Sequence, residues 1–272
     1  MNRIGKYEEI PFTKSRKNIT IILHQGWKKH AIHALLEFDV TESKQKIKKI
    51  RKENGKDISF TGWVIKCVAE TLKEDSSLNS LRHGKNKIVT FEDVDVGMAI
   101  EREVSGEFRP IPLLLRQANE MNVYQITEKI REAQKIEVDE TTQVIGEELT
   151  GFEKFVIKAP LLLKKLFIGH YGRKGLVKKQ HMGTVGMSAI GMQGNFPGWA
   201  IPLGGSQAFM LLIGGVTKKP GVIDDETIGV RDIMHVTLTV DHDIIDGGPM
   251  VRFVDILGKN LKNGAGLDLE QN

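Results

Sequence analysis

The segment HVTLTVDHDIIDGG, residues 235–248, combines the pattern of a buried strand with side chains that can do chemistry. Because the side chains of a strand alternate between its two faces, Val236, Leu238 and Val240 share one face. His242 continues that apolar row if strand pairing extends past Val240. Burial favours the neutral form of histidine, which is the form that a general base needs near pH 7. The segment therefore predicts a strand that ends at a proton-accepting histidine.

The residues after His242 predict a turn and then a helix. Asp246 stands directly before the expected helix, where a carboxylate acts as a cap or as a salt-bridge anchor. Gly247 and Gly248 permit a tight turn. His235 begins the strand on the face opposite His242, and we expect it to be exposed or in a cross-strand contact.

Strand and helix patterns alternate along the rest of the chain, which predicts the α/β class. We expect further strands at residues 30–40, 87–91, 94–101, 108–115, 184–190 and 208–217, besides the one at 230–241. We expect helices at residues 41–54, from 59, at 119–135, within 151–180 and from 248. Residues 18–23 fit either a strand or a frayed helix. Pro110 and Pro112 indicate an edge strand or a bulge.

The composition excludes several classes of protein. The chain has 272 residues and one cysteine, so it holds no disulfide framework and no multi-cysteine zinc site. Cys67 lies on the apolar face of the helix expected from residue 59, which favours a buried small side chain over a nucleophile. The longest apolar run, residues 208–216, is about half of a membrane span, and residues 1–10 have no apolar core. We therefore expect a cytoplasmic protein with no transmembrane segment and no metal site.

Five segments, in order, resemble the dihydrolipoamide acyltransferases, the catalytic cores of 2-oxo acid dehydrogenase complexes, and chloramphenicol acetyltransferase. HDIIDG at 242–247 matches their H-x-x-x-D-G motif, and GTVGMSAIGMQG at 183–194 is similar to G-T-F-T-I-S-N-L-G-x-x-G. QAFMLLIG at 207–214 resembles Q-A-x-I-L-A-I-G, and AIHALLEFDV at 31–40 resembles I-P-H-Y-x-x-x-x-D-V without its proline. VDVGMAI at 94–100 also has a counterpart.

The resemblance implies a trimer with the chloramphenicol acetyltransferase-like fold, a two-layer α/β sandwich in which helices pack on a mixed sheet. His242 would deprotonate the thiol of coenzyme A or dihydrolipoamide, and Ser188 would hydrogen-bond the tetrahedral oxyanion. The two side chains would come from different subunits. Asp246 and Gly247 would be structural, with Asp246 bridging to an N-terminal arginine, for which Arg16 is the candidate. The resemblance assigns no particular residues to coenzyme A binding.

The chain also departs from these relatives. Asp243 stands where the complex-forming enzymes commonly have arginine; it either raises the pKa of His242 or points to solvent. We expect residues 1–29 to form an arm and residues 30–272 a single catalytic domain, without a lipoyl domain or a peripheral-subunit-binding domain. A lipoyl group would therefore act only in trans, on a separate lipoyl or carrier protein. The trimers could assemble further into a cube or a dodecahedron.

The net charge of +4 conceals a basic helical insertion at residues 151–180. Its eight cationic side chains, with no acidic residue between 154 and 180, are Lys154, Lys158, Lys164, Lys165, Arg173, Lys174, Lys178 and Lys179. A solvated helix packed on its own subunit is one interpretation. The others are attraction to coenzyme A phosphates, to an acidic carrier protein or to an anionic membrane surface. We expect no nucleic-acid partner.

Three functions remain open from the sequence. The first is a coenzyme A-dependent acyltransferase that uses a thiol acceptor such as dihydrolipoamide. The second is a trimeric scaffold or interaction protein that has lost acyl transfer, which Asp243 would favour. The third is an O-acetyltransferase that acts on a small molecule.

Overall fold

The computed structural model describes residues 4–104, 107–138, 145, 155–156, 159–192, 197–202, 205, 207–224 and 226–268. Its helices are α1 (Lys14–Gly26), α2 (Thr41–Asn54), α3 (Phe60–Glu74), η1 (Ser76–Leu78), α4 (Val123–Lys135), α6 (Leu161–Tyr171), α7 (Gly175–Met182), η2 (Ile190–Met192) and α8 (Gly247–Asn263). Its strands are β1 (Ala31–Asp39), β2 (Ser80–His83), β3 (Lys87–Thr90), β4 (Val96–Val104), β5 (Glu107–Leu115), β6 (Val185–Ala189), β7 (Phe209–Asp224) and β8 (Thr227–Asp241).

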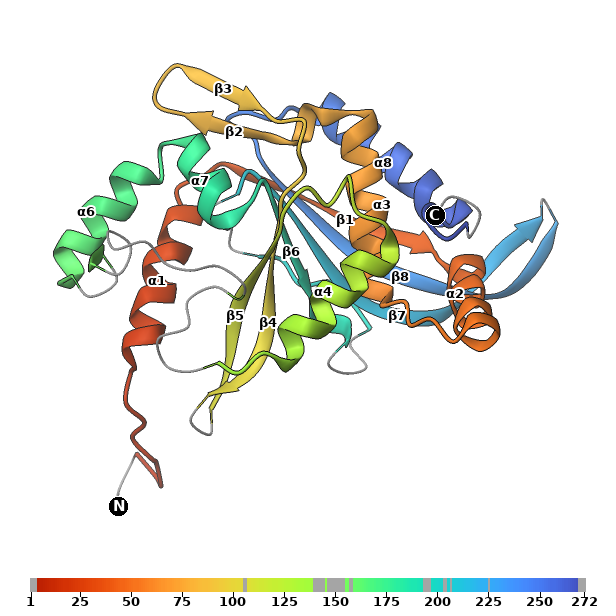
Figure 1. Ribbon diagram of the computed structural model, residues 1–272, viewed down its shortest axis with the longest axis horizontal. Helices are drawn as coiled ribbons and strands as arrows, with labels where there is room; N and C mark the ends of the chain where they lie inside the picture. The colour runs from red at the N-terminus through yellow and green to blue at the C-terminus, as the bar shows by residue number, and fades with distance from the viewer. Residues whose placement is uncertain are drawn as a thin grey trace.

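A six-stranded mixed sheet forms the centre of the molecule, in the order β1-β8-β7-β6-β4-β5 (Figure 1). The pairs β1/β8, β7/β8 and β4/β5 are antiparallel, whereas β6 runs parallel to both β7 and β4. Strands β2 and β3 form a separate antiparallel pair. The α/β class and the mixed sheet packed with helices are therefore confirmed.

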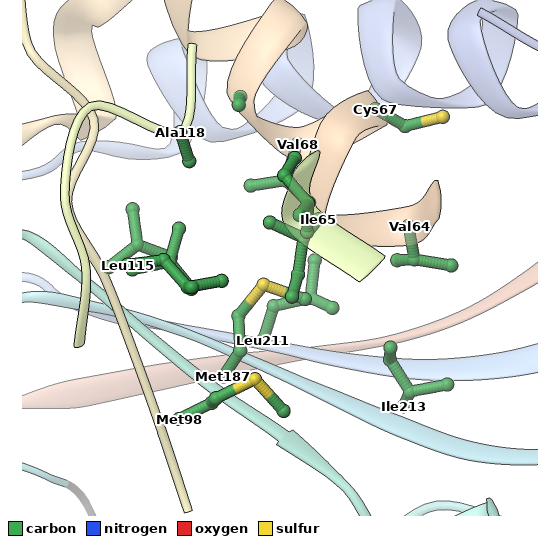
Figure 2. Packing of buried hydrophobic residues seen from close by; sticks show 14 of the residues in the cluster. Val64, Ile65, Cys67, Val68, Met98, Leu115, Ala118, Met187, Leu211 and Ile213 are labelled. Carbon is green, nitrogen blue, oxygen red and sulfur yellow. The ribbon is translucent and has the colours of Figure 1, made fainter. Parts of the chain in front are cut away.

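Helices α3, α4 and α8 pack together and bury the apolar residues of the sheet (Figure 1). Figure 2 shows Ile65 and Val68 of α3 lying over Met187 and Leu211 of the central strands. Cys67 is fully buried on the same helix, as expected. Each fully buried aliphatic side chain contributes about 1.5–3 kcal/mol through burial, so this contact fixes the sheet on which the site is built.

Most predicted elements are present, and local chemistry explains where they begin and end. Gly55 ends α2 with a left-handed φ of 64°, and the Ser59 hydroxyl accepts a hydrogen bond from the Gly62 amide at the start of α3. Strand β5 is an edge strand, as its two prolines predict. Residues 18–23 are helical, within α1.

The structure differs from the expected elements at three places. Helix α4 begins at Val123 rather than near 119, because Asn122 and Gln125 form a capping box there. A threonine at the start of a charged helix predicts an N-cap at Thr41, but the N-cap position is Val40, and the Thr41 hydroxyl donates a hydrogen bond to Asp39 Oδ1. Strand β2 was not predicted at all, since four mostly polar residues carry no periodic signal.

Strands β7 and β8 are longer than expected and continue beyond the sheet as a hairpin (Figure 1). A register shift between Ile213 and Val216 interrupts the β7/β8 pairing just beyond the part of β7 that pairs with β6. Four apolar side chains near its tip are 49–74% exposed, namely Val222, Ile223, Ile228 and Val230.

The described part of the basic insertion forms two helices that pack on the chain itself. Lys164 of α6 donates a hydrogen bond to Asn18 of α1, and Lys179 of α7 lies 3.5 Å from Asp93 and 3.6 Å from Asp95. Lys154 and Lys158 lie outside the described residues. In the described ranges, no helix has both the length and the apolar character needed to cross a membrane.

Candidate active site

His242 lies in the turn that follows β8. The strand ends at Asp241, but the His242 amide still donates to the carbonyl of His30 at 2.9 Å. The His242 Nδ1 lies 3.1 Å from the carbonyl oxygen of Ile245. A carbonyl oxygen only accepts, so Nδ1 carries the proton and Nε2 keeps its lone pair. This tautomer has the nitrogen that a general base requires.

The expected burial of His242 is wrong for the single chain. Val236, Leu238 and Val240 are fully buried, but the His242 side chain is 45% exposed, because His242 is the first residue of the turn after β8. Any further desolvation of this imidazole has to come from another molecule.

Asp246 precedes α8 at its N-cap position, yet its side chain makes no capping hydrogen bond. One carboxylate oxygen lies 3.7 Å from His242 Nδ1, and the side chain is 88% exposed. Gly247 and Gly248 lie in the first turn of α8 without positive φ values, so the tight turn expected of them is wrong. A Cβ on Gly247 would meet only open space.

Arg16 lies exposed on α1, and it forms no ion pair with Asp246 among the described residues of one chain. The Arg16–Asp246 bridge therefore stays a prediction.

Ser188 lies on β6, beside the middle of the sheet. It stands opposite Leu212 of β7, which in turn stands opposite Thr237 of β8. His242 follows Thr237 by five residues, which corresponds to roughly 17 Å along the strand direction. One chain therefore does not bring Ser188 and His242 together.

The Asp243 side chain pairs with residues other than His242. Its Oδ1 lies 2.7 Å from His30 Nδ1, its Oδ2 lies 3.7 Å from Arg82 Nη1, and its amide donates to Asp241 Oδ1. The hydrogen bond with Asp243 raises the pKa of His30. Neither of the two roles expected of Asp243 includes this pairing with His30 and Arg82.

Two partly buried lysines, Lys29 and Lys178, lie near Asp241, whose charge acts on both of them. Lys29 donates to the carbonyls of Gly205 and Gln207 at 2.7 and 2.5 Å. Burial, together with the charge of Lys178, lowers the pKa of Lys29 to about 7. Burial also lowers the pKa of Lys178. Lys178 was expected only as part of the basic insertion, and the position of Lys29 was not predicted, because the approach of both lysines to Asp241 depends on how distant segments pack.

His235 is buried rather than exposed, and the cross-strand alternative is correct. Its Nδ1 lies 2.9 Å from the Gly215 carbonyl, and its Nε2 lies 3.6 Å from Glu37 on β1. Trp199 packs edge-on against the ring at 4.6 Å. These contacts describe a structural histidine.

A cavity of about 530 Å³ lies between α3, the end of α8 and the segment before α4, and neither Ser188 nor His242 lines it. Its lining carries both charges, including Lys66, Glu70 and Glu120. Among the described residues, no three His, Cys, Asp or Glu side chains form a metal-binding group.

The sequence model of the 2-oxoacid dehydrogenases acyltransferase (catalytic domain) family matches residues 4–155 and 169–267. The chain belongs to this family. The acyltransferase match omits residues 156–168, which lie within the segment that we expected to be inserted.

Curated acyltransferase relatives agree with this assignment. The lipoamide acyltransferase component of the branched-chain alpha-keto acid dehydrogenase complex of Bacillus subtilis is 28% identical over 91% of this chain and 50% of its own length. The dihydrolipoyllysine-residue acetyltransferase component of the pyruvate dehydrogenase complex of Mycobacterium tuberculosis is 25% identical over 79% of this chain and 33% of its own length. The chain thus spans half or less of these relatives.

Solved acyltransferase structures share the fold. A probable dihydrolipoamide acetyltransferase from Listeria monocytogenes has a TM-score of 0.68 at 22% identity, with 99% of this chain and 98% of that chain covered. The dihydrolipoamide acetyltransferase of Azotobacter vinelandii also has a TM-score of 0.68, at 16% identity, with 98% and 96% covered. That structure was solved to study a serine, a histidine and an asparagine in its catalytic mechanism.

Proposed function

We propose that this chain is the catalytic domain of a coenzyme A-dependent acyltransferase, and that His242 of one subunit works with Ser188 of the next. The observation that carries the proposal is the hydrogen bond from His242 Nδ1 to the Ile245 carbonyl, which fixes Nε2 as the free base. A thiol with an ordinary pKa near 8.5 needs only such a base to become a thiolate.

The reaction follows from these two side chains. His242 Nε2 takes the proton from the acceptor thiol, and the thiolate attacks the thioester carbonyl of acyl-coenzyme A. The Ser188 hydroxyl donates a hydrogen bond to the oxyanion of the tetrahedral intermediate. The carbon–sulfur bond to coenzyme A then breaks, and its thiolate takes the proton back from His242. Acyl-coenzyme A and a thiol give a new thioester and free coenzyme A.

The proposed acceptor is dihydrolipoamide, carried by a lipoyl domain or a carrier protein. The names of the Bacillus subtilis and Mycobacterium tuberculosis relatives support this class of acceptor. In the Azotobacter vinelandii protein, the histidine and the asparagine lie four positions apart, as His242 and Asp246 do here. That spacing supports a role for Asp246 beside the base.

The proposed functional unit is a homotrimer, because a site shared between neighbours resolves the separation of Ser188 from His242 in one chain. The exposed apolar tip of the β7–β8 hairpin supports an interface between copies, since surfaces rarely leave several large apolar side chains together in water. One structural neighbour, at 16% identity, is the cubic core of a pyruvate dehydrogenase complex. We extend the proposal to a larger assembly, in which trimers of this chain form a cube or a dodecahedron.

An acyl-transfer assay tests the proposal. The protein is incubated with acetyl-coenzyme A and dihydrolipoamide, the acyl-dihydrolipoamide product is measured by chromatography, and coenzyme A binding is measured by calorimetry. We expect product formation, binding and a trimer in sedimentation. A trimer that neither binds coenzyme A nor transfers the acyl group would instead support a scaffold, and transfer to hydroxyl acceptors alone would support an O-acetyltransferase. A monomer would contradict the shared site.

A further inference from the structure

The dipeptide His242-Asp243 is held at two points by one residue, His30. The His30 carbonyl accepts the His242 amide at 2.9 Å, and the His30 side chain contacts Asp243 Oδ1 at 2.7 Å. The first contact extends the β1/β8 pairing by one residue. The second ties the turn to the start of β1.

Other elements complete the restraint on this turn. Arg82 of β2 approaches the second oxygen of Asp243 at 3.7 Å, and Asp241 Oδ1 accepts the Asp243 amide at 3.2 Å. The ring of His242 is itself fixed by the Ile245 carbonyl. The residues on both sides of the proposed base are thus held: Asp241 pairs with β1, and the Asp243 side chain pairs with His30 and Arg82.

We infer that His30 is a positioning residue for His242, and that it acts through Asp243. The inference rests on the proposed function of His242 as the base. It gives the acid next to the base a specific role: Asp243 belongs to a pair that orients the turn, and its charge is shared with His30 and Arg82.

The His30–Asp243 ion pair weakens as the pH rises. The groups that act on the His30 ring are Asp243, which hydrogen-bonds it, and Asp241; Arg82 faces the same carboxylate from β2. The pKa of His30 is raised by Asp243. The charged pair is therefore complete below the ordinary histidine pKa of about 6.5 and is lost as the pH rises through the raised value.

The test compares His30→Gln, Asp243→Asn and the double variant with the wild type in the acyl-transfer assay. At pH 6 we expect each single variant to lower kcat about two- to fivefold, the range for an exposed ion pair, with KM for coenzyme A unchanged. The double variant should be no slower than the slower single variant. The ratio of wild-type kcat to His30→Gln kcat should fall toward one as the pH rises past the His30 pKa.

Asp255→Asn is the control, because Asp255 forms another surface ion pair, with Lys259 on α8 at 2.6 Å, that does not contact His242 or its turn. We expect it to change neither kcat nor its pH dependence. A His30→Gln ratio that stays constant with pH, or independent effects that multiply in the double variant, would overturn the inference.

NMR titration of the histidine rings tests the positioning role of His30 independently of the proposed function. We expect Asp243→Asn to lower the pKa of His30 and to shift the ring resonances of His242. Unchanged resonances of both histidines would refute the positioning role, even in an active enzyme. A wild type with no acyl transfer would refute the proposed function, while the resonances would still report whether His30 and Asp243 orient His242.

Discussion

Replacing His242 by alanine is expected to lower kcat for acyl transfer by about 10²–10⁴-fold, the usual contribution of a general base. The reason is that Nε2 of His242, left unprotonated by the Nδ1 bond to Ile245, is the proposed proton acceptor. Its exposure in the single chain means that the fold itself loses little when the ring is removed. The measurement is the rate of acyl-dihydrolipoamide formation at saturating substrates, together with the thermal midpoint of unfolding.

His170→Ala is the control for this substitution, because His170 is an exposed histidine on α6. We expect that variant to keep wild-type activity. A His242→Ala variant that folds, assembles and transfers acyl groups at the wild-type rate would remove His242 from the mechanism.

Replacing Ser188 by alanine is expected to lower kcat about 10²–10³-fold, the effect of removing one oxyanion donor. The hydroxyl stabilises charge that exists only in the transition state, so KM should change little. Pairing with β7 holds the Ser188 backbone in place, and the serine is only partly buried, which leaves it accessible to a neighbour.

Ser188→Thr keeps a hydroxyl at the same position and serves as the matched variant. It should retain more activity than Ser188→Ala. Equal kcat in the wild type and Ser188→Ala would show that another group stabilises the oxyanion.

Much of the fold follows from local sequence patterns. The apolar face of α3, the stop at Gly55 and the edge position of β5 all rest on periodicity, glycine φ values or the missing amide of proline. These effects act within a few residues, so one sequence is enough to predict them.

The site was harder to predict because it depends on contacts between distant residues. The strand pattern placed His242 in a buried row, but the turn after Asp241 exposes it. The pairing of Asp243 with His30 spans 213 positions, and no local pattern encodes it. The register of β1 against β8 was the missing signal, since Ala31 stands opposite Asp241 and brings His30 to the turn.

The role of the charges in the basic insertion was hard to predict for the same reason, since it also depends on contacts between distant residues. The sequence of the insertion left open whether the segment packs on its own subunit or attracts an anionic partner. In the structure, Lys179 pairs with Asp93 and Asp95, and Lys178 lies partly buried near Asp241. Long-range pairs with the chain's own carboxylates therefore absorb part of the positive charge.

Mixing the two inactive variants, Ser188→Ala and His242→Ala, tests the shared site most directly. The subunits are dissociated, combined in equal amounts and reassembled, and acyl transfer is measured. In a ring with one repeated head-to-tail interface, about one quarter of the sites join an intact His242 to an intact Ser188. We therefore predict recovery to about a quarter of wild-type activity, whereas a mixed trimer as inactive as its parents would contradict a site built from two subunits.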